Sequence, residues 1–181
     1  MKPNLILAFA VGSILSASSF ALAGPGDHHP PASTQPAGNE DSGHSHKHLK
    51  YDELPEPVRK TVDAARGQAE LEHIFVTKTK QGTDVYVVEF ELDDAEHQLA
   101  TLGDGSVFKH EQTVTIESLP EEVRKSVLAA ANGATIDLLE KISRPASKSN
   151  PLYYEAKFTV DDVHHTVRVS PEGLVIEHSK E

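Results

Sequence analysis

One helix-like segment occurs twice in this 181-residue chain, and the repetition limits how the chain can fold. LPEPVRKTVDAA begins at Leu54 and LPEEVRKSVLAA begins at Leu119, so the second copy lies 65 residues after the first. In both copies, apolar residues recur at steps of three and four, the period of a helix with one buried face. We therefore predict two equivalent amphipathic helices.

A second set of matches follows each predicted helix, where the apolar period changes to two. DVYVVEFELD and LYYEAKFTV alternate in the manner of half-buried strands. Asp-Asp and Gly-containing turns separate two further strands in each copy, and weaker strands are expected in HIFVTKTK and DLLEKIS. The strand matches are 68 residues apart, as from Tyr86 to Tyr154, because the loop SRPASKSNP lengthens the second copy.

These patterns predict an α+β fold made of two tandem helix-plus-antiparallel-sheet repeats. The first repeat is expected to span residues 51–115 and the second residues 116–181. In each repeat, a helix packs on one face of about four antiparallel strands. One unit of this size buries little apolar surface, so we expect the two units to pack together.

The first 23 residues have the features of a secretory signal peptide. Lys2 precedes an apolar stretch that begins at Leu5, and the small-residue site Ala21-Leu22-Ala23 ends it. A membrane anchor is the alternative, but Gly12 and Ser13 interrupt the apolar run. We predict cleavage near Ala23 and a periplasmic or secreted protein without stable membrane insertion.

Residues 24–50 are rich in Pro, Gly, Ser and His, and predict a disordered tail, because they offer almost nothing to bury. The formal net charge of the chain is -11, which disfavours nucleic acid and anionic lipid as partners. The sequence contains no cysteine, so disulfides cannot stabilise the exported protein.

Histidines in the tail are the first candidates for metal binding. His28 and His29 are adjacent, and His44, His46 and His48 stand at alternate positions. Neutral imidazole binds Zn, Cu and Ni, and a flexible chain can place several rings around one ion. The alternative is a solubilising linker whose histidines bind metal only incidentally.

Four further histidines keep their position in both repeats. Strand parity predicts that the two in each repeat share one sheet face, close enough to hold one ion, unless a bulge intervenes at the turn. Aspartates at the neighbouring turns offer additional oxygen ligands. The alternative is a half-buried packing role, because structural zinc needs four donors and Asp-Asp is common in turns. The histidines are His97, His110, His165 and His178, and the aspartates are Asp93, Asp94, Asp161 and Asp162.

Catalytic motifs are missing from the sequence. Without cysteine there is no thiol nucleophile, and no serine stands in a nucleophile-elbow pattern. The sequence also has no phosphate-cradling glycine loop and no His-Glu-x-x-His helix. We therefore expect that the protein is not an enzyme.

The repeated motifs resemble those of the PepSY-like family, also described as β-lactamase-inhibitor-like proteins. The resemblance rests on the Leu-Pro-x-x-Val-Arg-Lys helix opening, the Tyr-x-x-x-Phe strand and the acidic-Gly turn, from Tyr51 to the C-terminus. It implies an exported, non-enzymatic α+β protein with helices on one side of an antiparallel sheet and a sheet face for protein recognition. It brings no catalytic residues, and the disulfides that such inhibitors can use are absent here.

The leading functional prediction is noncovalent binding of an envelope or extracellular protein through the sheet face or its loops, as an inhibitor or modulator. An exposed apolar or aromatic patch on the sheet, with Tyr86, Tyr153 or Tyr154 at its centre, would support such binding by providing anchors, and a uniformly polar open face would contradict it. The alternative prediction is a metal-binding or metal-buffering protein that uses the histidine tail, with or without the repeated sheet histidines.

Overall fold

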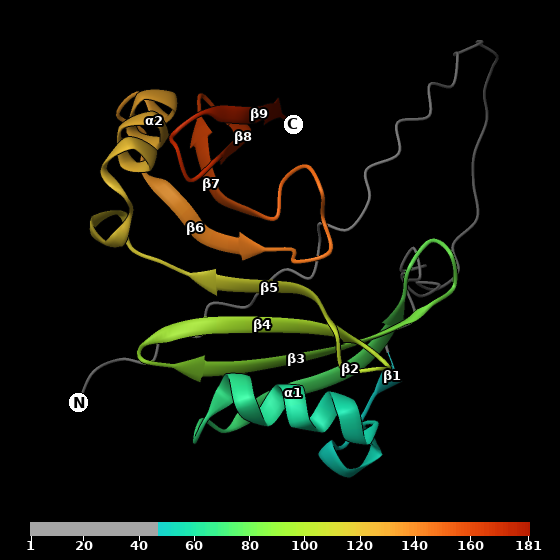
Figure 1. Ribbon diagram of the computed structural model, residues 1–181. Coiled ribbons are helices and arrows are strands. Elements are labelled where there is room, and N and C mark those ends of the chain that lie inside the picture. Colours follow the sequence, from blue (N-terminus) through green and yellow to red (C-terminus); the bar gives the residue numbers. More distant parts are fainter. Residues whose placement is uncertain (1–46) are drawn as a thin grey trace, which may run out of the picture. The chain divides into compact units, whose positions relative to one another are not determined.

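The computed structural model describes residues 47–181, whose strands form one continuous nine-stranded antiparallel sheet (Figure 1). The order of the strands in the sheet is the same as their order in the sequence. Two α-helices, each preceded by a short 3₁₀ helix, interrupt the run of strands. The strands are β1 (Lys47–His48), β2 (Leu71–Lys78), β3 (Asp84–Leu92), β4 (Ala95–Leu102), β5 (Val107–Thr113), β6 (Ile136–Ser143), β7 (Leu152–Val160), β8 (Val163–Val169) and β9 (Val175–Lys180); the helices are η1 (Tyr51–Glu53), α1 (Glu56–Arg66), η2 (Ile116–Ser118) and α2 (Glu121–Ala131).

This architecture corrects the predicted fold class. The prediction of two tandem helix-plus-antiparallel-sheet repeats is wrong, because β5 pairs with β6 from His110–Ser143 to Thr113–Glu140 and joins all the strands into a single sheet. An unpaired strand edge exposes backbone N–H and C=O groups, and the pairing of β5 with β6 satisfies them on both sides. The fold is therefore β-rich, with two helices on one large sheet.

The two helices form where the sequence places apolar residues one turn apart. In α1, Val58 and Val62 are fully buried, and in α2, Val123 and Val127 are fully buried. Pro57 lies in the first turn of α1, where its missing N–H is not needed for the helical ladder. Each helix thus has one apolar stripe, which packs on the sheet.

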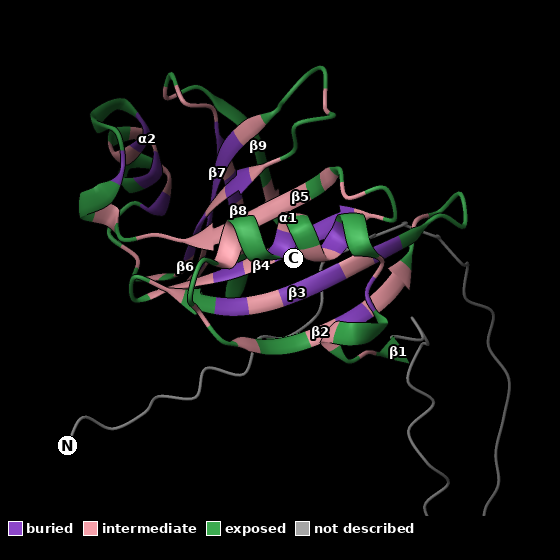
Figure 2. Cartoon of the chain, turned by 60° about the horizontal axis from the view of Figure 1, so that its bottom comes forward, coloured by how far each residue is buried: buried purple, intermediate pink, exposed green. Residues whose placement is uncertain are grey.

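Strand register places both helices over the same sheet face, here called the helix-covered face. Leu99 of β4 belongs to the core under α1 and pairs with His110 of β5, which pairs with Ser143 of β6. Leu139, of the same parity as Ser143, belongs to the core under α2. Figure 2 shows buried residues along β3 and β7, and exposed residues along the helices.

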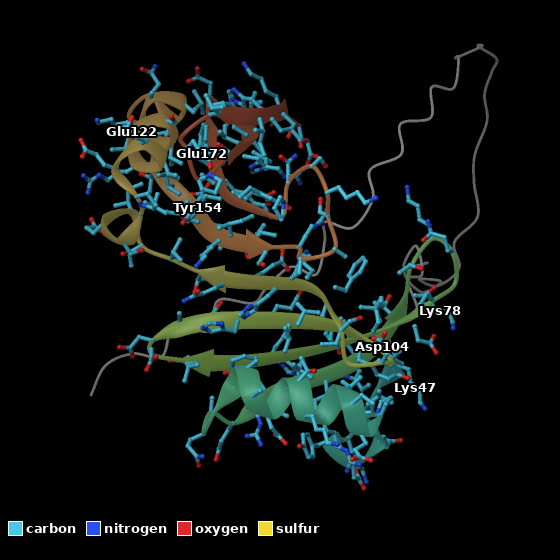
Figure 3. All side chains as sticks on the ribbon, in the orientation of Figure 1. Lys47, Lys78, Asp104, Glu122, Tyr154 and Glu172 are labelled. Carbon is cyan, nitrogen blue, oxygen red and sulfur yellow. The ribbon has the colours of Figure 1, made fainter. Side chains whose placement is uncertain are left out.

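Two turns press closely against the helices. Thr61 of α1 donates its hydroxyl hydrogen to the Gly105 carbonyl at 2.7 Å, and Ser126 of α2 donates to the Gly173 carbonyl in the same way. A Cβ atom on Gly173 would lie 2.8 Å from the Glu122 carbonyl oxygen, so this approach requires glycine. Figure 3 labels Glu122 and the neighbouring turn residue Glu172.

The opposite side of the sheet, here called the helix-free face, has an apolar cluster of its own. Phe75, Val85, Val87 and Ala100 are buried there, and the cluster includes no residue of α1 or α2. Lys47 and His48, which the sequence analysis placed in the tail, pair with β2. Within residues 47–181, the structure contains no helix that is long and apolar enough to cross a membrane.

Candidate functional site

Charged side chains cross the helix-free face on β5 to β8. Glu140 of β6 lies opposite Glu155 of β7, and Glu111 of β5 lies opposite Ile142, which has the same parity as Glu140. Three carboxyl groups therefore occupy adjacent strands on one face. The basic residues on this face are Lys109 of β5, Lys157 of β7 and Arg168 of β8.

All three basic groups form ion pairs with carboxylates other than that of Glu140. The Lys109 Nζ atom lies 2.6 Å from Glu111 Oε1. Glu155 is paired twice, with Arg168 Nε at 2.6 Å and with Lys157 Nζ at 3.5 Å. Arg168 also contacts Glu177 of β9.

Glu140 is the unpaired member of this group. Only 7% of its surface is exposed, and within residues 47–181 its carboxyl group has no hydrogen-bond or ion-pair partner. Burial, followed by the charges of Glu111 and Glu155, raises the pKa of Glu140 to about 7, while the charges of Lys157 and Lys109 oppose the increase. This carboxyl group therefore changes between its protonated and ionised forms near neutral pH.

Tyr153 lies on the same face, on the strand that carries Glu155. It is 5% exposed, and the Arg168 guanidinium lies over its ring, 5.6 Å from the centroid. Burial raises the pKa of its phenol. A small cavity of about 150 Å³ opens beside the ring, and the inserted loop of the second copy forms one of its walls. The cavity is lined by Arg144, Ser147, Ser149, Asn150, Tyr153, Arg168, Ile176 and Glu177.

The three tyrosines that would have supported a binding patch do not form an exposed one. Tyr86 packs against the core under α1, and Tyr154, labelled in Figure 3, is part of the core under α2. Tyr153 alone of the three lies on the helix-free face, and it is buried. The helix-free face therefore combines buried apolar groups with charged groups.

The four repeated histidines form two contacting pairs on the helix-covered face. His97 Nδ1 lies 3.0 Å from His110 Nε2, and His165 Nδ1 lies 3.0 Å from His178 Nε2. In each pair one imidazole donates and the other accepts. His97 stacks on Phe90 with ring centroids 5.1 Å apart, and His165 stacks on Phe158 at 5.2 Å.

Strand parity had predicted a shared face only for turns without a bulge. Both hairpins contain a register shift, between Ala100 and Thr101 and between Arg168 and Val169, and the members of each pair nevertheless share a face.

The two pairs differ in their surroundings. His97 is 9% exposed, whereas the His165–His178 contact is on the surface. Burial lowers the pKa of His97, and it lowers the pKa of His110, together with the charges of His97 and Lys141. The pKa of His165 is also lowered by burial, then by Lys180 and His178. These imidazoles therefore favour the neutral form, which is the form that binds metal.

A metal ion would find two imidazoles in each pair. Within residues 47–181, no group of three or more His, Asp or Glu side chains is arranged to hold a metal ion. The four turn aspartates instead have positive φ angles and form the hairpin turns before β4 and β8. Among the tail histidines, His48 packs against Phe75 with ring centroids 6.4 Å apart. His28, His29, His44 and His46 lie outside the described residues.

The charged group around Glu140 was missed by the sequence analysis. The available signal was parity: Glu155 and Lys157 alternate with the apolar residues Tyr154, Ala156 and Phe158 of β7. Parity assigns residues to a face within one strand. It does not show that β5 joins β6, and this pairing is what brings Glu111 close to Glu140.

The fold has relatives among solved structures, although no protein-family model and no curated protein matches the sequence. A DUF2874 family protein from Bacteroides ovatus has a TM-score of 0.56 and 13% identity, over 70% of this chain and 87% of its own. A BLIP-like protein from Bacteroides fragilis has a TM-score of 0.57 and 12% identity, over 70% of this chain and 86% of its own. A protein from Bacteroides eggerthii that is described as periplasmic has a TM-score of 0.57 and 13% identity, over 70% and 88%.

At sequence identities of 12% and 13%, the similarity to these structures shows a shared fold and nothing about function. The chain shares the β-rich fold of DUF2874 family proteins and of the BLIP-like protein. The resemblance to the PepSY-like family rests on the sequence motifs alone, and these comparisons do not show that family.

Proposed function

We propose that this chain is an exported, non-enzymatic binding protein of the cell envelope, which recognises another protein through its helix-free face. The observation that carries the proposal is Glu140, a buried carboxyl group without a partner among residues 47–181, on a face that neither α1 nor α2 covers. Within residues 47–181, no fully buried side-chain oxygen lacks a hydrogen-bond partner, so the Glu140 carboxyl group keeps a small exposed area. Burial still disfavours its ionised form, and a cationic partner would offset that free energy.

Further observations support the same function. The signal peptide predicts export, and a solved neighbour is described as periplasmic. The sequence motifs resemble PepSY-like proteins, and another neighbour is described as BLIP-like, which favours protein recognition, including inhibition of an envelope enzyme. The acidic net charge argues against nucleic acid as the partner.

Site-specific photo-crosslinking in the cells that produce the protein tests the proposal. A photoreactive phenylalanine analogue replaces Gln98 or Thr166 on the helix-free face and, as the control, Lys60 on the exposed side of α1. We expect a light-dependent adduct of one defined mass from Gln98 and Thr166, but not from Lys60. Adducts from Lys60 alone, or equal adducts from all positions, would contradict the proposal.

Metal binding is the second candidate function, and the 3.0 Å contacts within the two histidine pairs favour it. Two neutral imidazoles supply half of a tetrahedral site for Zn or Cu, and the tail histidines or a second molecule would supply the rest. Calorimetric titration of Zn and Cu into the mature chain tests this function, with a His110→Ala/His178→Ala double variant and with a variant in which alanine replaces the tail histidines. Binding that weakens in the double variant would support a role for the sheet pairs. Equal binding by that variant would exclude it.

A further inference from the structure

We infer that the partner anchors on the helix-free face with a basic side chain, lysine or arginine, which pairs with Glu140. This inference rests on the proposed function and specifies the chemistry of the partner. It comes from the pairing of charges, the burial of Glu140 and its proton equilibrium.

The ion pairs on this face include every one of its three central carboxyl groups except that of Glu140. Glu111 is neutralised by Lys109 on its own strand, and Glu155 is neutralised by Arg168 and Lys157. Glu140 stands between Glu111 and Glu155 without a cation of its own within residues 47–181. A cationic group brought by a partner would complete the alternation of charges across β5, β6 and β7.

The surroundings favour an organic cation on an extended side chain over an acidic or apolar anchor. An acidic anchor would meet three carboxylates, and an apolar anchor would leave the Glu140 carboxyl group buried without a hydrogen bond. The aliphatic stem of lysine or arginine can pack on partly exposed apolar residues of this face, such as Leu138, which lies on the same face of β6 as Glu140. A bare metal ion is disfavoured, since no group of three suitable ligands occurs within residues 47–181.

Proton exchange links this contact to pH. The groups that face Glu140 are Glu111 and Lys109 from β5 and Glu155 and Lys157 from β7, and burial is the main reason that its pKa lies at about 7. A cation favours the ionised carboxylate, so binding lowers the pKa of Glu140 and releases its proton. The affinity for a cationic anchor should therefore rise as the pH rises through about 7.

NMR titration with short peptides provides the test. The probes are acetyl-Gly-Arg-Gly-amide and the matched peptide with citrulline, which has the shape of arginine without the charge. We expect the arginine peptide to shift amide signals of β5, β6 and β7, with an affinity at least about tenfold higher than that of the citrulline peptide. The Glu140→Gln variant should lose this difference, whereas Glu56→Gln, which removes an exposed carboxyl group on α1, should keep it.

The native chain gives a second readout that does not depend on any variant. Its affinity for the arginine peptide should increase by several fold between about pH 6 and about pH 8, while the weak binding of the citrulline peptide stays constant. Equal binding of the two peptides, shifts confined to other elements, or an unchanged preference in Glu140→Gln would overturn the inference.

The crosslinking experiment separates this inference from the proposed function. Glu140→Gln is combined with the photoreactive residue at Thr166. If the adduct forms at full yield in the variant, the helix-free face binds a partner and the basic anchor is wrong. If no adduct forms at Thr166 or Gln98 in the native background, the proposed function itself fails. Loss of the adduct only in the variant would support both.

Discussion

Glu140 and Glu155 face each other across β6 and β7, yet Glu155 has two cationic partners and Glu140 has none within residues 47–181. Both side chains are almost completely buried, at 7% and 5% exposure. Arg168 and Lys157 both form ion pairs with Glu155 at this position. The same sheet therefore holds one neutralised carboxylate and one that is available to a partner.

The stability of the free protein should depend on the ionisation of Glu140. Its native pKa of about 7 lies above the ordinary value of 4.5, so its contribution to stability is full below about pH 4.5 and is lost as the pH rises through about 7. The loss amounts to about 3 kcal/mol. Glu140→Gln should remove this pH dependence and should be more stable than the native chain at pH 8. Urea unfolding of both proteins between pH 5 and pH 8 measures it, and parallel curves would contradict the prediction.

The buried pair of His97 and His110 should have the opposite pH dependence. The pKa values of His97 and His110 are lowered, so their contribution to stability is present above about pH 6.5 and is lost as the pH falls below it toward the lowered native values. His110→Ala should cost about 1–2 kcal/mol at pH 7.5 and should reduce the dependence on pH. His178→Ala, at the exposed pair, should cost less than half as much. Equal losses in thermal unfolding would show that burial does not distinguish the pairs.

Arg168 should stabilise the protein more than an exposed lysine in an equally close ion pair. Arg168→Ala would leave the buried Glu155 with Lys157 alone, at 3.5 Å, and should cost about 3 kcal/mol. Lys125 contacts Glu121 at 2.8 Å, but both side chains are mostly exposed, so Lys125→Ala should cost less than about 1 kcal/mol. Chemical denaturation of the two variants tests the difference, and a cost for Arg168→Ala as small as that of Lys125→Ala would count against the buried pair.

The turn before β5 should tolerate no side chain at Gly105. A Cβ atom there would lie 2.6 Å from the Pro57 carbonyl oxygen, and φ is +82°. Gly82 has nearly the same φ, +81°, and nothing within 4 Å of its Cβ position. Gly82→Ala should cost about 1 kcal/mol for the backbone alone, whereas Gly105→Ala should cost about 2–3 kcal/mol more, because α1 must move. Equal melting temperatures for the two variants would contradict this close approach.

Local elements of the fold were predictable from the sequence because their signals are local. The spacing of Val58 and Val62 predicted a helix, and the structure confirms α1 at this position. The Asp-Asp pairs predicted turns, and the positive φ angles of Asp93 and Asp94 confirm the first of them.

The single sheet could not be predicted in the same way. Duplicated sequences specify equivalent elements, but they do not show whether the edge of one copy pairs with the edge of the next. Thr113 and Glu140 meet in the register between β5 and β6, and no periodicity within either strand indicates that contact.

The candidate site could not be predicted either, because it also depends on the pairing between β5 and β6. Glu140 lies in a strand that also contains Asp137 and Lys141, and charged residues in such a strand are expected to point to solvent. Its burial depends on the residues that β5 and β7 place beside it, and its lack of a cation depends on the pairing of Lys109 with Glu111.

Parity alone does not give the shared face of His97 and His110, because a register shift between Ala100 and Thr101 lies between them and decides which residues of β5 share a face with His97. A metal-binding role for these histidines stays a prediction.

The proposed basic anchor requires that the Glu140 carboxyl group on the helix-free face is buried and unpaired in the free protein. The most direct measurement is a carbon-13 NMR titration of the Glu140 side-chain carboxyl in the mature, ligand-free protein. The expected midpoint is about 7. A Glu140 midpoint near 4.5 would contradict the account, because it would mean that this carboxyl group is hydrated or already paired.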